Sequence, residues 1–128
     1  MFKLNHISVQ LAERLNEFLK GEVSPTENRV LICSPKDQDT KVGNLIIPGT
    51  TEEGMPREGV LIMLGPISEE YQTYKDMLTT GQVLVYGLYA GKEVDIELPE
   101  DVSLPSDKWD FTVLALNEII FVRNNKNV

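Results

Sequence analysis

The sequence is poor in the residues on which enzyme and metal sites most often depend. Its 128 residues contain one cysteine, Cys33, and one histidine, His6. A single cysteine excludes an internal disulfide framework and suits a reducing compartment, so we expect a cytoplasmic protein. We expect Cys33 to be a buried, unreactive thiol and His6 to lie on the surface.

Motifs for catalysis are missing as well. The chain has no cysteine pair, no Gly-x-Ser-x-Gly turn and no His-Glu-x-x-His pattern. Adjacent acids such as Glu52-Glu53 are typical of solvated surface rather than of a catalytic pair. The sequence therefore predicts a protein that is not an enzyme and has no metal site and no cofactor.

Long apolar runs and clusters of basic residues are also missing. The longest apolar runs are about five residues, far short of the roughly 20 that a membrane-spanning helix needs. The N-terminus has no apolar signal-peptide core, which predicts no secretory signal. Twelve basic residues against 20 acidic ones give a net charge of −8, and a nucleic-acid backbone needs clustered Lys and Arg. We expect neither a membrane nor a nucleic acid as partner.

The apolar runs that are present predict strands. A hydrophobic content of 41% over 128 residues suits one domain with one modest core. The runs recur about every ten to twenty residues with glycine turns between them, which predicts a mainly β fold, a small and partly open β-barrel. The expected strands are residues 28–33, 60–64, 82–86, 93–98, 111–116 and 118–122.

One predicted turn superficially resembles a phosphate loop. We expect residues 82–86 and 93–98 to form a hairpin about Gly87 to Gly91. A phosphate loop needs four residues between its glycines and Ser or Thr after its lysine, whereas here there are three, and Glu93 follows Lys92. The glycines are therefore interpreted as turn residues that allow positive φ.

The stretch from Gly43 to Pro66 has two halves of opposite character. Leu45, Ile46 and Ile47 are three aliphatic residues within a polar segment, too few for a core strand. The residues expected to shape this segment are Gly43, Asn44, Pro48 and Gly49. Residues 60–64 are an unbroken apolar run, typical of a strand buried on both faces. An apolar triplet beside such a strand predicts a binding loop on a scaffold, and a short edge strand is the alternative.

Four blocks in order then resemble one family. They are Asn-Arg-Val at 28–30, Gly-Asn-Leu-Ile-Ile-Pro at 43–48, a glycine-started strand and Tyr-Ala-Gly-Lys-Glu-Val turn within 81–94, and Glu-Ile-Ile-Phe-Val at 118–122. Across residues 28–122 the chain resembles the small co-chaperonins, the GroES-like lids of group I chaperonins. Any one block alone is weak, but four in the right order are specific.

The resemblance implies a function for each segment. A mobile loop at about 36–57 would carry Leu45, Ile46 and Ile47 to a groove on each subunit of the nucleotide-bound chaperonin. The chain would form a homo-heptamer that encloses an unfolded client protein, and the partner would bind and hydrolyse ATP. A roof segment at about 66–80, a hairpin in the family and otherwise a solvated loop or a helical turn, would place Glu69, Glu70 and Tyr71 at the orifice.

Three segments depart from the family pattern. Residues 1–27 form an extension in which residues 9–20 have helical apolar spacing, which predicts a short amphipathic helix that ends at Gly21. We favour packing of this helix on its own barrel; contact with a neighbouring subunit or the client is the alternative. Residues 99–110 form an insertion, and 123–128 a polar tail. Trp109 is predicted to cover the barrel core rather than to bind a ligand.

These departures keep two further hypotheses open. The chain could be a non-catalytic β-barrel interaction module or adaptor with a different partner. Proteolysis would separate the two functions, because the lid predicts preferred cutting between about Lys36 and Arg57 and the adaptor predicts protection there. The departures also suggest a virus-encoded lid from a bacteriophage, acting in the host cytoplasm on an unusual client.

Overall fold

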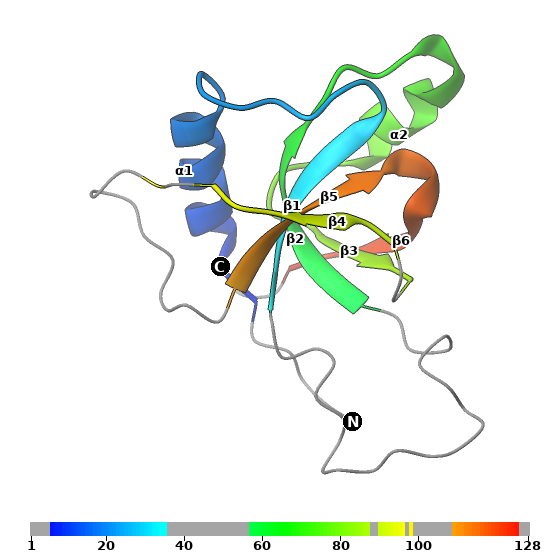
Figure 1. Ribbon diagram of the computed structural model, residues 1–128. Coiled ribbons are helices and arrows are strands. Elements are labelled where there is room, and N and C mark those ends of the chain that lie inside the picture. The colour runs from blue at the N-terminus through cyan, green and yellow to red at the C-terminus, as the bar shows by residue number, and fades with distance from the viewer. Residues whose placement is uncertain (1–5, 36–56, 88–89, 97, 99–108, 126–128) are drawn as a thin grey trace, which may run out of the picture.

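The chain folds into one curled antiparallel sheet with short helices against it, as the computed structural model in Figure 1 shows. The structure describes residues 6–35, 57–87, 90–96, 98 and 109–125. In this part of the chain the strands are β1 (Arg29–Pro35), β2 (Arg57–Leu64), β3 (Val83–Tyr86), β4 (Lys92–Val94), β5 (Trp109–Ala115) and β6 (Ile119–Arg123). Their order is β4-β5-β1-β2-β3-β6. The predicted mainly β, partly open barrel is confirmed.

The central strands are buried on both faces, which explains their unbroken apolar sequences. Along β1, Val30 and Ile32 belong to one core and Leu31 and Cys33 to the other. The α2-side core consists of Val30, Ile32, Leu61, Leu78, Leu84, Tyr86, Leu114 and Leu116. The α1-side core consists of Ile7, Ala12, Leu15, Leu19, Leu31, Cys33, Val60, Ile62, Met63, Val83 and Phe111. The prediction for residues 60–64 is confirmed, since Val60 and Ile62 enter the α1-side core and Leu61 between them enters the α2-side core.

Helix α1 (Val9–Leu19) confirms the helix predicted from about Val9 to Lys20. The Ser8 side chain caps its start by accepting a hydrogen bond from the Leu11 amide at 3.1 Å. The C-cap is Lys20, one residue before the expected Gly21. The N-terminal extension is therefore a capped helix.

The apolar side of α1 covers one face of the sheet (Figure 1). Asn16 fixes the helix to β2, because its Nδ2 donates to the Ile62 carbonyl at 2.7 Å. The helix residues in the core are exposed by no more than 2%: Ala12, Leu15 and Leu19. Trp109 is half-buried against the same core, as expected of a residue that covers it. The favoured prediction, packing on its own barrel, is what the chain does.

The predicted hairpin of residues 82–86 and 93–98 is wrong. β3 already has a partner on each edge, because Val83 pairs with Val60 of β2 and with Arg123 of β6. β4 instead pairs with β5, with Lys92 opposite Val113. Both hydrogen-bonding edges of β3 are thus occupied. The chain that follows β3 therefore crosses to the free edge of β5, where it forms β4.

Gly91 makes this crossing possible. Its φ is +82°, and an added Cβ would lie 2.8 Å from Thr112 Cγ2 and 2.9 Å from Leu114 Cδ2. A glycine is needed both for the left-handed backbone and for the close approach to β5. The turn role expected of Gly91 is confirmed.

The predicted roof segment is helical rather than a hairpin. A 3-10 turn, η4 (Glu69–Tyr71), leads directly into helix α2 (Gln72–Met77). Glu69 and Glu70 lie in the first turn, where negative charge is favourable, and the stretch lacks the alternation of a strand. The helical alternative is therefore correct, and the hairpin is wrong.

Asn28 holds this segment to the start of β1. Its φ is +60°, a conformation that asparagine tolerates better than most residues. Its backbone N–H donates to the Pro66 carbonyl at 2.7 Å. Its side-chain Oδ1 accepts a hydrogen bond from the backbone N–H of Ser68 at 2.9 Å. The carbonyl of Asn28 accepts from Leu116, in the turn η5 (Leu116–Glu118), at 2.9 Å. One residue thus joins the predicted roof segment to the start of β1 and to the end of β5, which lie at the same end of this antiparallel pair.

Across the ranges that the structure describes, no helix is long and apolar enough to cross a membrane.

Candidate functional site

The predicted chaperonin-binding residues lie outside the described part of the chain. Leu45, Ile46 and Ile47, with their expected shaping residues Gly43, Asn44, Pro48 and Gly49, all fall within 36–56. The structure instead places the two strands that this segment connects. β1 ends at Pro35 and β2 begins at Arg57.

The two strands are direct neighbours in the sheet. They pair antiparallel, with Val30 opposite Leu64 and Cys33 opposite Val60. Residues 36–56 therefore leave and re-enter the sheet at the same end. A connection longer than about 12–15 residues inside a compact domain is usually either a functional segment or a linker. The position supports a binding segment between β1 and β2.

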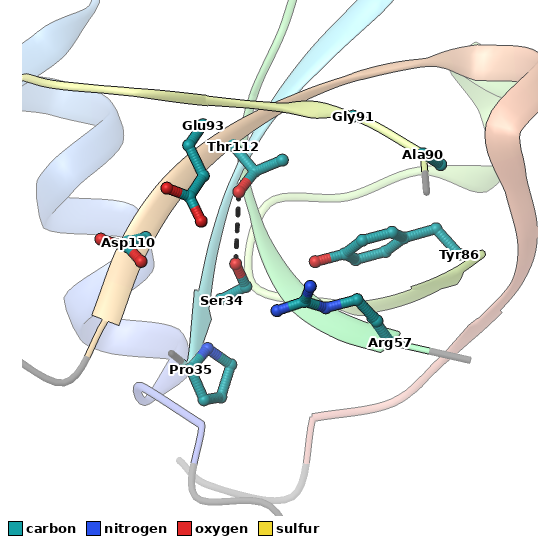
Figure 2. A pocket seen from close by; sticks show the side chains of 9 residues that line it. All are labelled: Ser34, Pro35, Arg57, Tyr86, Ala90, Gly91, Glu93, Asp110 and Thr112. Carbon is teal, nitrogen blue, oxygen red and sulfur yellow. Dashed lines mark hydrogen bonds between the residues drawn. The ribbon is translucent and has the colours of Figure 1, made fainter. Parts of the chain in front are cut away.

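A small cavity lies at this end of the sheet (Figure 2). Its volume is about 130 Å³, and it is lined by Ser34, Pro35, Arg57, Tyr86, Ala90, Gly91, Glu93, Asp110 and Thr112. Figure 2 shows Arg57 and Tyr86 extending from one side and Glu93 and Asp110 from the other. Between them, the buried hydroxyls of Ser34 and Thr112 lie 3.3 Å apart. Charges of both signs thus line one polar end of the barrel.

The one cysteine and the one histidine of the chain, Cys33 and His6, are not part of this cavity. Burial, together with the nearby charge of Asp110, raises the pKa of the Cys33 thiol to about 12, so this side chain is not a thiolate at neutral pH. The expected buried, unreactive thiol is confirmed. Within the described ranges, no group of three or more His, Cys, Asp or Glu side chains could hold a metal ion.

The prediction that His6 lies on the surface is wrong. His6 is 8% exposed, and its Nε2 lies 2.8 Å from Glu58 Oε1. The carboxylate of Glu58 also accepts hydrogen bonds from Arg123, at 2.5 Å from Nη2 and 3.3 Å from Nε. Sequence reasoning missed this cluster because its members are 52 and 65 residues apart. A charged residue at the start of an otherwise apolar strand was the only available signal.

These partners determine the ionisation of Glu58. Partial burial alone raises the pKa of its carboxyl group, but the hydrogen bonds from Arg123 and His6 and their nearby charges outweigh this effect. The pKa of Glu58 therefore lies below the ordinary value for glutamate. Glu58 is ionised at neutral pH and is held from two directions.

The Glu58 interactions predict a pH-dependent contribution to stability. Because folding lowers the pKa of Glu58, the carboxylate stabilises the fold at pH values above its unfolded pKa of about 4.3. This contribution is lost as the pH falls from there through the lower pKa of the folded state. We expect the difference in Tm between the natural chain and Glu58→Gln to be largest near pH 7 and to shrink towards about pH 3, measured by circular dichroism.

Glu17→Gln is the matched control for that measurement. It breaks an exposed carboxylate pair with Lys20, so its Tm should differ little from that of the natural chain at any pH. A Tm difference for Glu58→Gln that stays constant from pH 7 to about pH 3 would contradict the assignment.

The predicted orifice residues lie beyond the opposite end of β2. Glu69 and Glu70 are exposed, whereas Tyr71 is half-buried against the α2-side core. The ring of Tyr71 packs beside that of Tyr74, with centroids 5.6 Å apart. The predicted orifice residues thus follow the end of β2, whereas residues 36–56 precede its start.

Together these features define a class of protein: a small, partly open β-barrel with a long connection between its first two paired strands. Comparison with known proteins identifies the family within this class. The family model described as "Chaperonin 10 Kd subunit" matches residues 22–121, so the chain belongs to this family. The match begins after α1 and ends before Arg123.

Several curated relatives agree with the family match. The chain is 34% identical over 77 residues to the co-chaperonin GroES of Gemmatimonas aurantiaca, covering 59% of this chain and 78% of that protein. It is 31% identical over 75 residues to the co-chaperonin GroES of Bacteroides fragilis, covering 59% and 79%. It is 27% identical over 104 residues to the co-chaperonin GroES of Exiguobacterium sibiricum, covering 80% of this chain and 99% of the relative.

Proposed function

We propose that the chain is a co-chaperonin that caps a nucleotide-bound group I chaperonin ring and encloses a client protein while the partner folds it. The observation that carries the proposal is the family match over residues 22–121, which includes the whole connection between β1 and β2. In this proposal Leu45, Ile46 and Ile47 bind a hydrophobic groove on each chaperonin subunit. ATP is bound and hydrolysed by the partner, and this chain is not an enzyme.

The chemistry of the triplet supports a weak, reversible contact at each subunit. Burying three aliphatic side chains contributes about 1.5–3 kcal/mol each. Ordering even a few loop residues at roughly 1–2 kcal/mol each offsets much of that gain, and ordering a dozen would exceed it. One copy would therefore bind weakly, as suits a lid that must leave in every cycle.

A homo-heptamer would supply the missing affinity. Once one of seven copies is bound, the others are held near their grooves at high effective concentration, so the ring binds far more tightly than one chain. Pro48 and Pro56 restrict the conformations of the free segment, which reduces the ordering cost. The proposed affinity is a property of the assembly.

The remaining segments have proposed places in this assembly. The roof segment at about 66–80 would surround the orifice, with the exposed acids Glu69 and Glu70 facing the opening and Tyr71 anchored in its own chain. Residues 1–27 precede the barrel of about 28–122, which contains the insertion 99–110, and 123–128 follow it. The protein would act in the cytoplasm, or in a host's cytoplasm if it is encoded by a bacteriophage.

The proposal is tested by mixing the purified protein with a group I chaperonin in the presence and absence of nucleotide. We expect a joint complex only with nucleotide, because the chaperonin groove is exposed in that state. Failure to form a complex under either condition would remove the co-chaperonin function and favour an adaptor with another partner.

A further inference from the structure

Three distant parts of the chain meet at Glu58. Its carboxylate is bonded by His6, which precedes α1, and by Arg123 at the end of β6. The two ends of the chain are also joined beside it, because Asn125 Nδ2 donates to the Ile7 carbonyl at 3.0 Å. We call His6, Glu58 and Arg123 the clasp.

The clasp lies where the 36–56 segment re-enters the sheet. Glu58 is the second residue of β2, and it pairs with Val85 of β3. The next residue, Gly59, has no side chain that could anchor the strand, and an added Cβ would lie 2.7 Å from Ile32 Cδ1. Glu58 therefore supplies side-chain anchoring near the start of β2, next to a residue that has no side chain.

Two of the three clasp residues lie outside the range of the family match. The family match covers residues 22–121, so Glu58 lies inside it, whereas His6 and Arg123 lie on either side of it. The N-terminal extension thus does more than cover the sheet. It brings the buried side chain of His6 into contact with the Glu58 carboxylate, next to the segment that carries the proposed binding triplet.

The bonds in the clasp are of the strong, charge-assisted kind. Arg123 contacts both oxygens of Glu58, and bidentate pairs of this type fix orientation as well as distance. The Glu58 side chain is 22% exposed and the His6 side chain 6%, so water competes only partly for their bond, whereas Arg123 is more open to water at 42%. Loss of either partner would leave the carboxylate less constrained and free the first residues of β2 to fray.

We propose that the clasp is a positioning device that fixes the start of β2 and so strengthens binding to the chaperonin, an inference that rests on the proposed function. Residues 57–59 need no further ordering when the adjoining segment binds, provided that the clasp holds them. If it is broken, these residues join the set that must be ordered on binding, and affinity falls. His6 and Arg123 act through Glu58 and not by touching the chaperonin.

The test compares clasp variants with variants that leave the clasp intact. His6→Ala and Arg123→Gln each remove a bond to Glu58, and we expect each to weaken nucleotide-dependent chaperonin binding by about 5- to 30-fold, the effect of ordering one further residue. His6→Gln places an amide nitrogen near the position of Nε2, so it should restore most of the affinity. Amide hydrogen exchange at residues 57–60 should be faster in the two weakened variants only.

Two controls separate positioning from general stability. Ile62→Val lightly truncates the α1-side core and leaves the clasp untouched, while Glu17→Gln breaks only an exposed pair with Lys20. Neither should change chaperonin affinity when circular dichroism shows a folded protein. If affinity follows thermal stability across all variants, including Ile62→Val, the clasp has no positioning role and the inference fails.

The outcomes also separate this inference from the function on which it rests. If the natural chain binds the chaperonin and the clasp variants bind equally well, the inference is wrong and the co-chaperonin function stands. If the natural chain does not bind with nucleotide, both fall together. Weakened binding by His6→Ala, rescued by His6→Gln, supports both.

Discussion

Replacing Ile46 and Ile47 by serine is expected to abolish chaperonin binding while the protein remains folded and assembled. Each buried isoleucine contributes about 1.5–3 kcal/mol, so the two substitutions remove about 3–6 kcal/mol from each contact. Only the contribution of Leu45, about 1.5–3 kcal/mol, then remains, which is too small to offset the cost of ordering the segment. Avidity in a heptamer strengthens contacts that each chain can form, so it cannot restore binding when the contact of a single chain no longer forms.

The experiment needs a control of matched position. Ile46→Val with Ile47→Val keeps most of the apolar surface, and binding should survive with a modest loss. Circular dichroism and native mass spectrometry of the protein alone should be unchanged in both double variants. If the serine variant unfolds or loses its assembly, these residues belong to the core and the binding assignment is wrong.

The second large effect is expected from removal of residues 1–20, which should leave a chain that does not fold stably. α1 covers the α1-side core, and without it apolar side chains of the sheet such as Leu31, Ile62 and Val83 would face water. Leu15→Ala alone, at a fully buried position, should cost about 2–5 kcal/mol. The total stability of a domain is about 5–15 kcal/mol, so we expect removal of the whole helix to leave the fold unstable.

Urea denaturation followed by circular dichroism measures this effect. Phe18→Ser is the matched control, since Phe18 lies on the same helix but is 37% exposed. Its unfolding midpoint should remain close to that of the natural chain, while that of Leu15→Ala should fall clearly. A truncated chain with an unchanged midpoint would show that the extension is not part of the folded unit.

This packing changes how the N-terminal extension is interpreted. Its apolar side is used within its own chain, so that side is not available to a neighbouring subunit or a client. The described part of the extension begins at the buried His6, which contacts Glu58, and continues into the capped helix. It is an integrated part of the domain, although the family match begins only at residue 22.

Elements marked by local patterns could be predicted from the sequence. The helical spacing of Leu11, Leu15 and Leu19 predicted α1, and the continuous apolar run at 60–64 predicted a strand buried on both faces. Both signals are strong because a helix or strand repeats its environment every few residues. The mainly β architecture and the family followed from runs of this kind and from the order of the motifs.

Features that depend on distant partners could not be predicted in this way. The pairing of β4 with β5 depends on β3 having two neighbours already, which no local pattern records. The burial of His6 depends on Glu58 and Arg123, brought to it only by the complete sheet. The roof segment has too few residues to distinguish a helical turn from a loop by periodicity.

Native mass spectrometry of the protein with a group I chaperonin tests the central claim most directly. The account predicts a homo-heptamer on its own, and a complex of one heptamer with a chaperonin ring that appears only when nucleotide is present. A monomer or dimer that leaves the chaperonin unbound with nucleotide would contradict it. The chain would then be a member of the family whose barrel serves a different partner.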